Sequence, residues 1–136
     1  MCGAVSFTAR NVPSHFNSCY CEMCRRWTGS RFLGVPMRRG DVDIKDETAV
    51  GTVHSSDWAE RGFCNKCGSA LWYALRGTDQ VNLSAGLFDD PQDMTLAHEY
   101  FVDQKTCVHA YADTRIQMTK AETLAKFAPA PEGEPQ

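Results

Sequence analysis

The chain has 136 residues, 43% of them hydrophobic and 23% charged, and 14 Lys and Arg against 17 Asp and Glu give a formal net charge of −3. This length suits a single domain, and the composition excludes a disordered, collagen-like or low-complexity chain. An acidic balance disfavours a broad nucleic-acid-binding surface, and no apolar run approaches the roughly 18–20 residues that span a bilayer. We therefore expect no nucleic acid and no membrane among the partners.

Most of the chain has the period-two pattern of half-buried β-strands. Turn signals separate the runs, among them Asn11-Val12-Pro13, Arg39-Gly40-Asp41 and Asp89-Asp90-Pro91. Many short strands without long helical periods between them predict an all-β fold. The expected strands cover residues 2–9, 15–21, 32–37, 42–44, 50–55, 59–63, 70–75, 80–88 and 96–102.

One helix is predicted near the end of the chain. Thr119 and Glu122 have the spacing of a capping box, and Leu124, Ala125 and Phe127 follow on a helical period. Residues 128–136 are rich in Pro and Glu and are expected to form a solvated tail. We therefore predict one domain over residues 1–127 and a flexible tail over 128–136.

Cysteine is the unusual component, with seven residues in this chain. The sequence opens Met1-Cys2-Gly3-Ala4 without the charged and apolar segments of a secretory signal, so we expect a cytoplasmic protein. In a reducing compartment, clustered thiols indicate metal binding or redox chemistry rather than structural disulfides.

The cysteines fall into groups whose spacing suits a metal ion. Cys19, Cys21 and Cys24 form C-x-C-x-x-C, and Cys64 and Cys67 form C-x-x-C. Alternate residues of a strand share one face, so Cys19 and Cys21 can converge, while a C-x-x-C turn places two sulfurs on one side of a knuckle. A redox C-x-x-C would need a βαβ context that this chain lacks. These groups favour zinc, although thiolate sites also accept iron or Cu(I).

Spacing alone allows two partitions of these thiols. One is a single four-thiolate site from Cys21, Cys24, Cys64 and Cys67. The other has two ions, one held by Cys19, Cys21 and Cys24 and one held by Cys2, Cys64 and Cys67. A three-ligand site with an open position is typical of catalytic zinc, whereas a closed site is structural.

The ordered motifs resemble the glutathione-dependent formaldehyde-activating enzyme family, whose domain also occurs in centromere protein V. The resemblance covers about residues 2–112 and rests on the segments Cys2-Gly3-Ala4-Val5, Cys19-Tyr20-Cys21-Glu22-Met23-Cys24-Arg25-Arg26, Arg61-Gly62-Phe63-Cys64-Asn65-Lys66-Cys67-Gly68-Ser69, Gly86-Leu87-Phe88-Asp89-Asp90-Pro91 and Ala97-His98-Glu99-Tyr100-Phe101-Val102.

The resemblance implies a β-tent of antiparallel sheets with two zinc ions. It assigns structural zinc to Cys2, Cys64 and Cys67, and catalytic zinc to Cys19, Cys21 and Cys24. The family's first motif has a further cysteine two positions before Cys2, so the fourth structural ligand is expected to be water, the Met1 amine or a residue upstream. Cys107 is expected to take part in neither site.

The implied activity is that of a carbon–sulfur lyase acting on a thiol–aldehyde adduct such as S-hydroxymethylglutathione. Glutathione, or another small-molecule thiol, is the expected partner. Arg25 and Arg26 are candidate partners for its carboxylates, and His98 is a candidate proton shuttle.

The alternative is a non-catalytic, zinc-stabilised interaction module on the same fold. We also expect a homodimer. The tryptophans are expected to be core or rim aromatics: Trp27, Trp58 and Trp72.

Overall fold

The computed structural model of the chain describes residues 1–91, 93–106 and 118–127. Its strands are β1 (Phe7–Ala9), β2 (His15–Cys19), β3 (Phe32–Arg38), β4 (Val42–Ile44), β5 (Val50–Ser56), β6 (Ala59–Cys64), β7 (Ala70–Leu75), β8 (Gln80–Ser84) and β9 (Thr95–Tyr100). Its α-helices are α1 (Glu22–Thr28) and α2 (Lys120–Phe127). Single 3₁₀ turns lie at Arg39–Asp41, Glu47–Ala49, Ala85–Leu87 and Val102–Gln104.

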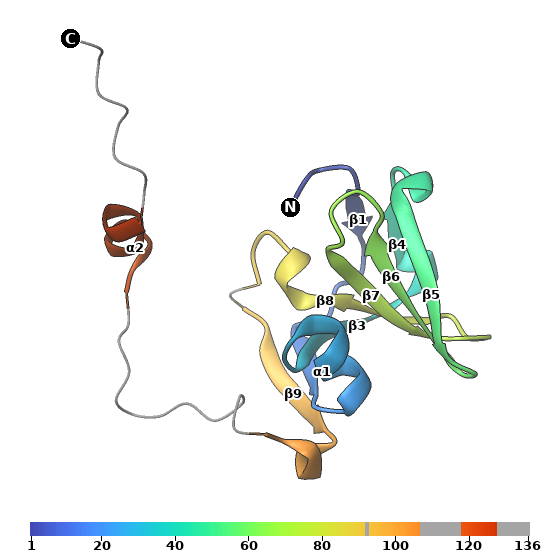
Figure 1. Ribbon diagram of the computed structural model, residues 1–136. Helices are drawn as coiled ribbons and strands as arrows, with labels where there is room; N and C mark the ends of the chain where they lie inside the picture. Colours follow the sequence, from blue (N-terminus) through green and yellow to red (C-terminus); the bar gives the residue numbers. More distant parts are fainter. Residues whose placement is uncertain (92, 107–117, 128–136) are drawn as a thin grey trace.

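The strands form two sheets, which confirms the predicted all-β fold (Figure 1). A seven-stranded sheet has the order β5-β6-β7-β8-β3-β2-β9, and β1 pairs with β4 in a two-stranded sheet. The pairs are antiparallel except β2 and β9, which run parallel with His15 opposite Thr95. The expectation of antiparallel sheets was wrong for this pair. The chain between β8 and β9 crosses the sheet before β9 begins, so β9 enters from the same end as β2.

Several of the expected strands differ in extent from the observed ones, and in the following three another conformation replaces part of the expected strand. The first begins at Phe7 rather than at Cys2, because the residues before it turn toward β6 instead of pairing. The strand expected over 80–88 ends at Ser84, where a 3₁₀ turn starts. The strand expected over 15–21 ends at Cys19, and α1, which was not predicted, follows it.

The core lies on one face of the large sheet. Alternate side chains of β3, β7 and β8 point to this face, including Val35, Ala74 and Leu83, each at most 2% exposed. Phe7 and Ala9 of β1 and Val42 of β4 pack against this cluster. The two-stranded sheet therefore covers the core, and the intervening side chains of β3, β6, β7 and β8 are left to line the opposite face.

Helix α2 begins with the predicted capping box. The Glu122 amide donates to Thr119 Oγ1 at 3.2 Å, and the Thr119 amide donates to Glu122 Oε2 at 2.6 Å. The predicted tail, residues 128–136, lies outside the described residues. Within the described part of the chain, no helix combines the length and apolarity that a membrane span requires.

Candidate functional site

Three cysteines meet at the junction of β2 and α1, and we call them the helix triad: Cys19, Cys21 and Cys24. Their sulfurs lie within 4.8 Å of one another. Cys19 ends β2, and Cys21 caps α1 by accepting a hydrogen bond from the Cys24 amide at 3.4 Å. Cys19 and Cys21 thus converge through a strand-to-helix turn, and not because both lie on one strand as the spacing had suggested.

Helix α1 has clear termini although it is short. Glu22 lies in its first turn and pairs with Arg26 at 2.5 Å, and Gly29 ends it in the left-handed conformation at φ 74°. Trp27 packs against Phe32 of β3 with ring centroids 5.4 Å apart, which holds the helix against the large sheet. The helix thereby fixes Cys24, which is 4% exposed, beneath it.

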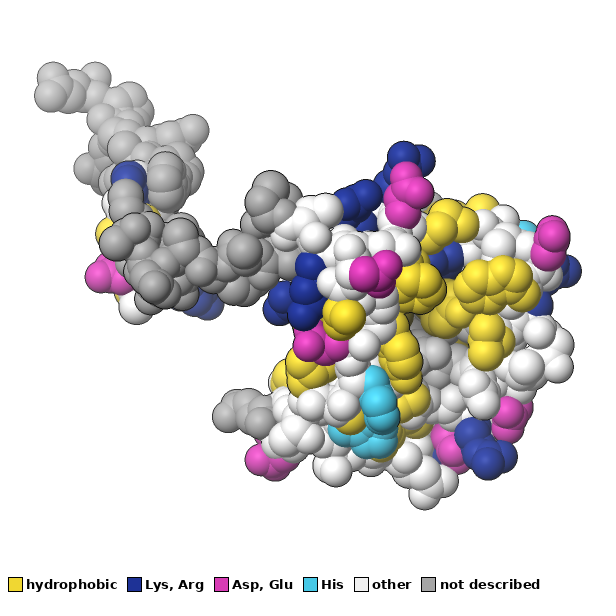
Figure 2. Space-filling view, turned by 90° about the horizontal axis from the view of Figure 1, so that it is seen from below, with side chains coloured by type: hydrophobic (Ala, Val, Ile, Leu, Met, Phe, Trp, Pro, Cys, Tyr) yellow, Lys and Arg dark blue, Asp and Glu magenta, His cyan; other side chains and the backbone are white. Residues whose placement is uncertain are grey.

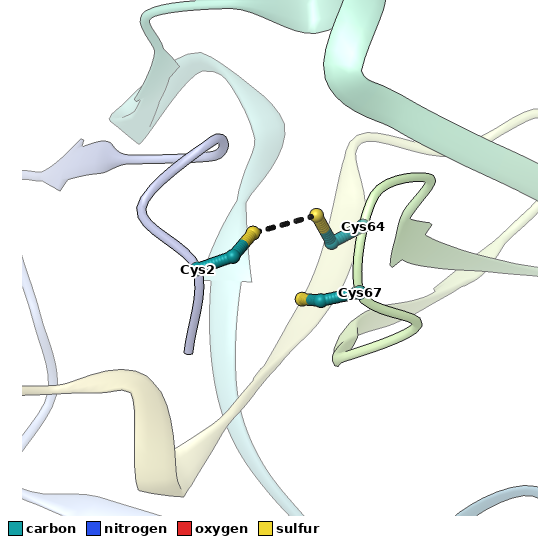
Figure 3. A group of neighbouring side chains, drawn as sticks. All are labelled: Cys2, Cys64 and Cys67. Atoms are coloured by element: carbon teal, nitrogen blue, oxygen red, sulfur yellow. Dashed lines mark hydrogen bonds between the residues drawn. The ribbon is translucent and has the colours of Figure 1, made fainter.

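The remaining described cysteines form a second group, the knuckle triad: Cys2, Cys64 and Cys67. Figure 3 shows their side chains turned toward one another from the N-terminal segment, the end of β6 and the turn after it. The turn is a tight knuckle in which Gly68, at φ 75°, donates its amide to the Cys64 carbonyl at 2.8 Å.

Both triads fit zinc by their donors and spacing. Zn–S bonds of about 2.3 Å in a tetrahedron place two sulfurs roughly 3.8 Å apart, and the Cys2 and Cys64 sulfurs are 3.7 Å apart. All six of these cysteines are free thiols in the structure. Of the two partitions, the structure brings together the two triads and not a four-thiolate group. Cys107 lies outside the described residues.

The thiols of each triad differ in their acidity. The hydrogen bond from Cys24 lowers the pKa of Cys19 to about 6, and the same hydrogen bond, with burial, raises the pKa of Cys24. The Ser69 hydroxyl, 3.2 Å from Cys67, lowers the pKa of that thiol to about 6. Each triad therefore contains a sulfur that is a thiolate at neutral pH even before a metal binds.

A buried arginine lies against the helix triad. Arg61 on β6 is 4% exposed and donates from Nη2 to the Cys24 sulfur at 3.7 Å and from Nη1 to the Ser55 hydroxyl. Its guanidinium lies 5.3 Å from the ring centroids of both Trp27 and Tyr73. Arg61 was not among the predicted site residues, because its immediate neighbours, Glu60 and Gly62, give no local sign that its charge is buried.

The helix triad opens into a cavity of about 950 Å³ on the face of the sheet opposite the core. Alternate strand residues line it, such as Pro36, Tyr73 and Asn82, while their neighbours along each strand face the core. Figure 2 looks onto the underside of the molecule and shows hydrophobic side chains gathered across its middle and upper right. The knuckle triad lines a separate, smaller cavity of about 480 Å³.

The other predicted site residues lie outside the lining of the large cavity. Arg26 is exposed and paired with Glu22, and neither Arg25 nor Arg26 is among the residues that line the cavity. His98 on β9 contacts Asn17 Oδ1 at 3.1 Å and stacks on Tyr100. The substrate and proton-transfer roles assigned to these side chains stay predictions.

The chain is similar in sequence to a known protein family and to individual proteins of other organisms. A family model described as glutathione-dependent formaldehyde-activating enzyme matches residues 1–104. The chain is 27% identical over 125 residues to an uncharacterized lyase of Schizosaccharomyces pombe, covering 91% of this chain and 90% of that protein. A protein of Halomonas elongata, provisionally named a glutathione-dependent formaldehyde-activating enzyme, is 35% identical over 82 residues, 52% of this chain and 50% of that protein.

The fold also has a counterpart among solved structures. A crystal structure of a Rhodobacter sphaeroides protein superposes with a TM-score of 0.59 at 18% identity, and the match covers 72% of this chain and 94% of the other. At this identity the likeness concerns the fold.

Proposed function

Because the chain belongs to the glutathione-dependent formaldehyde-activating enzyme family, we propose that it is a zinc-dependent carbon–sulfur lyase that joins and separates a thiol and an aldehyde. The observation that carries this proposal is the position of the helix triad in the lining of a ligand-sized cavity. The knuckle triad joins the N-terminal segment to the end of β6. A metal ion that links two distant parts of the chain in this way has a structural role.

In this proposal Cys19, Cys21 and Cys24 hold the catalytic zinc ion, and Cys2, Cys64 and Cys67 hold the structural one. Zinc with three protein ligands supplies an open coordination position and Lewis acidity. In the joining direction the thiol sulfur bonds to the carbonyl carbon, the C=O double bond becomes a C–O single bond, and the thiol proton ends on that oxygen. The lyase direction reverses each change, and glutathione with formaldehyde is the family's pairing.

The positive charge of Arg61 supports the assignment of the catalytic zinc ion to the helix triad. Three thiolates and one Zn²⁺ carry a net charge of −1, and the Arg61 guanidinium beside Cys24 opposes that charge in a buried setting. An electron-rich site of this kind favours binding of an incoming thiol over activation of water. Six free thiols persist in a reducing compartment, so we place the protein in the cytoplasm.

The test is the exchange rate between formaldehyde, glutathione and S-hydroxymethylglutathione, measured by NMR as the excess over the uncatalysed rate. We expect the zinc-loaded protein to raise the rate and Cys21→Ser to abolish the excess. Cys67→Ser, assayed at a temperature where it stays folded, is the matched control and retains the excess. A folded, zinc-loaded protein with no excess rate toward any thiol would contradict the proposal and favour a non-catalytic interaction module.

A further inference from the structure

Large apolar side chains gather at the mouth of the cavity above the helix triad. Met23, Trp58, Tyr100 and Phe101 all line this cavity and are 43%, 61%, 47% and 51% exposed. They come from α1, the β5–β6 turn, the end of β9 and the residue after it. Apolar side chains that rim a ligand-sized cavity indicate a binding surface, because scattered exposed residues would not converge in this way.

One of these side chains is held in an unfavourable backbone conformation. Phe101 has φ 58° and ψ 47°, in the left-handed region that bulky residues seldom occupy. Half of its surface is exposed, so packing in the free protein compensates only part of this strain. Strain of this kind concentrates where a side chain serves a ligand.

The charges of the cavity suit an anionic tripeptide poorly. Among its described lining residues are two arginines, Arg38 and Arg61, and three carboxylates, Glu22, Asp41 and Asp79. Arg38 pairs with Asp79 at 3.1 Å, and Arg61 is buried against the helix triad. The described lining therefore offers no exposed cation outside an ion pair to the two carboxylates of glutathione, which would call for forked donors.

We infer that the cavity selects a thiol carrying an aromatic or branched apolar group in preference to glutathione; this inference rests on the proposed function and names its substrate class. The thiol sulfur lies at the helix triad, and the apolar group extends from it to contact Trp58, Phe101 and Met23. The cavity volume of about 950 Å³ accommodates such a thiol together with a small aldehyde.

The direct test compares the dissociation constants of benzyl mercaptan and glutathione for the zinc-loaded protein, measured by calorimetry. Burial of a phenyl ring favours binding enough for benzyl mercaptan to bind at least about tenfold more tightly. Glutathione binding as tightly as benzyl mercaptan, or more tightly, would overturn the inference.

Two substitutions at the rim of the cavity, which is formed by Met23, Trp58, Tyr100 and Phe101, test whether these side chains cause the preference for benzyl mercaptan. Trp58→Ala is expected to reduce the benzyl mercaptan preference to about threefold or less, while Val53→Ala, which removes an exposed apolar side chain outside the cavity, leaves it unchanged. Phe101→Gly is expected to reduce the preference while keeping or raising the melting temperature, because glycine relieves the left-handed strain. A preference that survives both rim variants would overturn the inference.

Turnover is measured separately, so that the two claims fail in different ways. Tight benzyl mercaptan binding without any exchange by NMR supports the apolar site and contradicts the lyase. Exchange with glutathione, together with tighter glutathione binding, supports the lyase and contradicts the apolar site.

Discussion

Cys19 is the residue whose chemistry depends most on its neighbours. Its sulfur accepts a hydrogen bond from Cys24, which holds its pKa near 6 instead of the ordinary 9.0. In the metal-free protein the Cys19 thiolate is therefore present above about pH 6 and is lost as the pH falls through that value. We expect iodoacetamide to label Cys19 with a midpoint near pH 6, read by mass spectrometry after chelation of the metal.

Cys24→Ala provides the control for this prediction. The variant removes the hydrogen-bond donor, so the Cys19 midpoint is expected to move up toward the ordinary value. Cys24 itself is 4% exposed with a raised pKa and should label slowly at neutral pH. A Cys19 midpoint near 9 in the wild-type protein would contradict this view of the triad.

At the scale of the elements, β6 and β7 pack through a close approach at Gly62. Gly62 lies opposite Trp72, and a Cβ added at Gly62 would come within 2.1 Å of the indole Cε2. Trp72 is 7% exposed in the core and has little room to move. We expect Gly62→Ala to lower the free energy of unfolding by about 2–3 kcal/mol, measured by denaturant unfolding of the zinc-loaded protein.

Gly40→Ala is the matched substitution, because a Cβ at Gly40 meets nothing within 4 Å. Its effect on the free energy of unfolding should stay within about 0.5 kcal/mol. Equal losses in the two variants would show that the β6–β7 contact is looser than described.

The elements that the sequence predicted well are those with a local pattern. Strand β7 (Ala70–Leu75) has its predicted bounds, and α2 begins at the predicted cap, because alternation and capping are encoded by adjacent residues. Helix α1 spans seven residues, too few for a clear helical period, and its cap is Cys21 rather than one of the usual polar residues. The parallel pairing of β9 depends on a crossing of the sheet that no local signal specifies.

The site was partly predictable for the same reason. Cysteine spacing indicated the metal-binding groups, and the family resemblance indicated the partition into triads. Trp58, Arg61 and Phe101 carry no local motif, and they meet at or beside the cavity only because β6, α1 and β9 are brought together by the fold.

At the scale of the whole molecule, the two triads constrain the chain to different degrees. A metal at the knuckle triad would link Cys2 to Cys64 across 62 residues, whereas the helix triad links residues only five apart. Closing the longer loop removes more entropy from the unfolded chain, by about 2 kcal/mol. We therefore expect Cys2→Ser to lower the free energy of unfolding by about that much more than Cys21→Ser, both measured by denaturant unfolding in excess zinc. A larger loss in Cys21→Ser would contradict this division of roles.

The central claim is that six cysteine sulfurs, distant along the chain, gather around two zinc ions. Anomalous scattering at the zinc absorption edge, collected from crystals of freshly purified reduced protein, tests this most directly. We expect two anomalous peaks, one about 2.3 Å from the sulfurs of Cys19, Cys21 and Cys24 and one at the same distance from those of Cys2, Cys64 and Cys67. A fully folded protein without either peak, or with these sulfurs joined in disulfides, would contradict it.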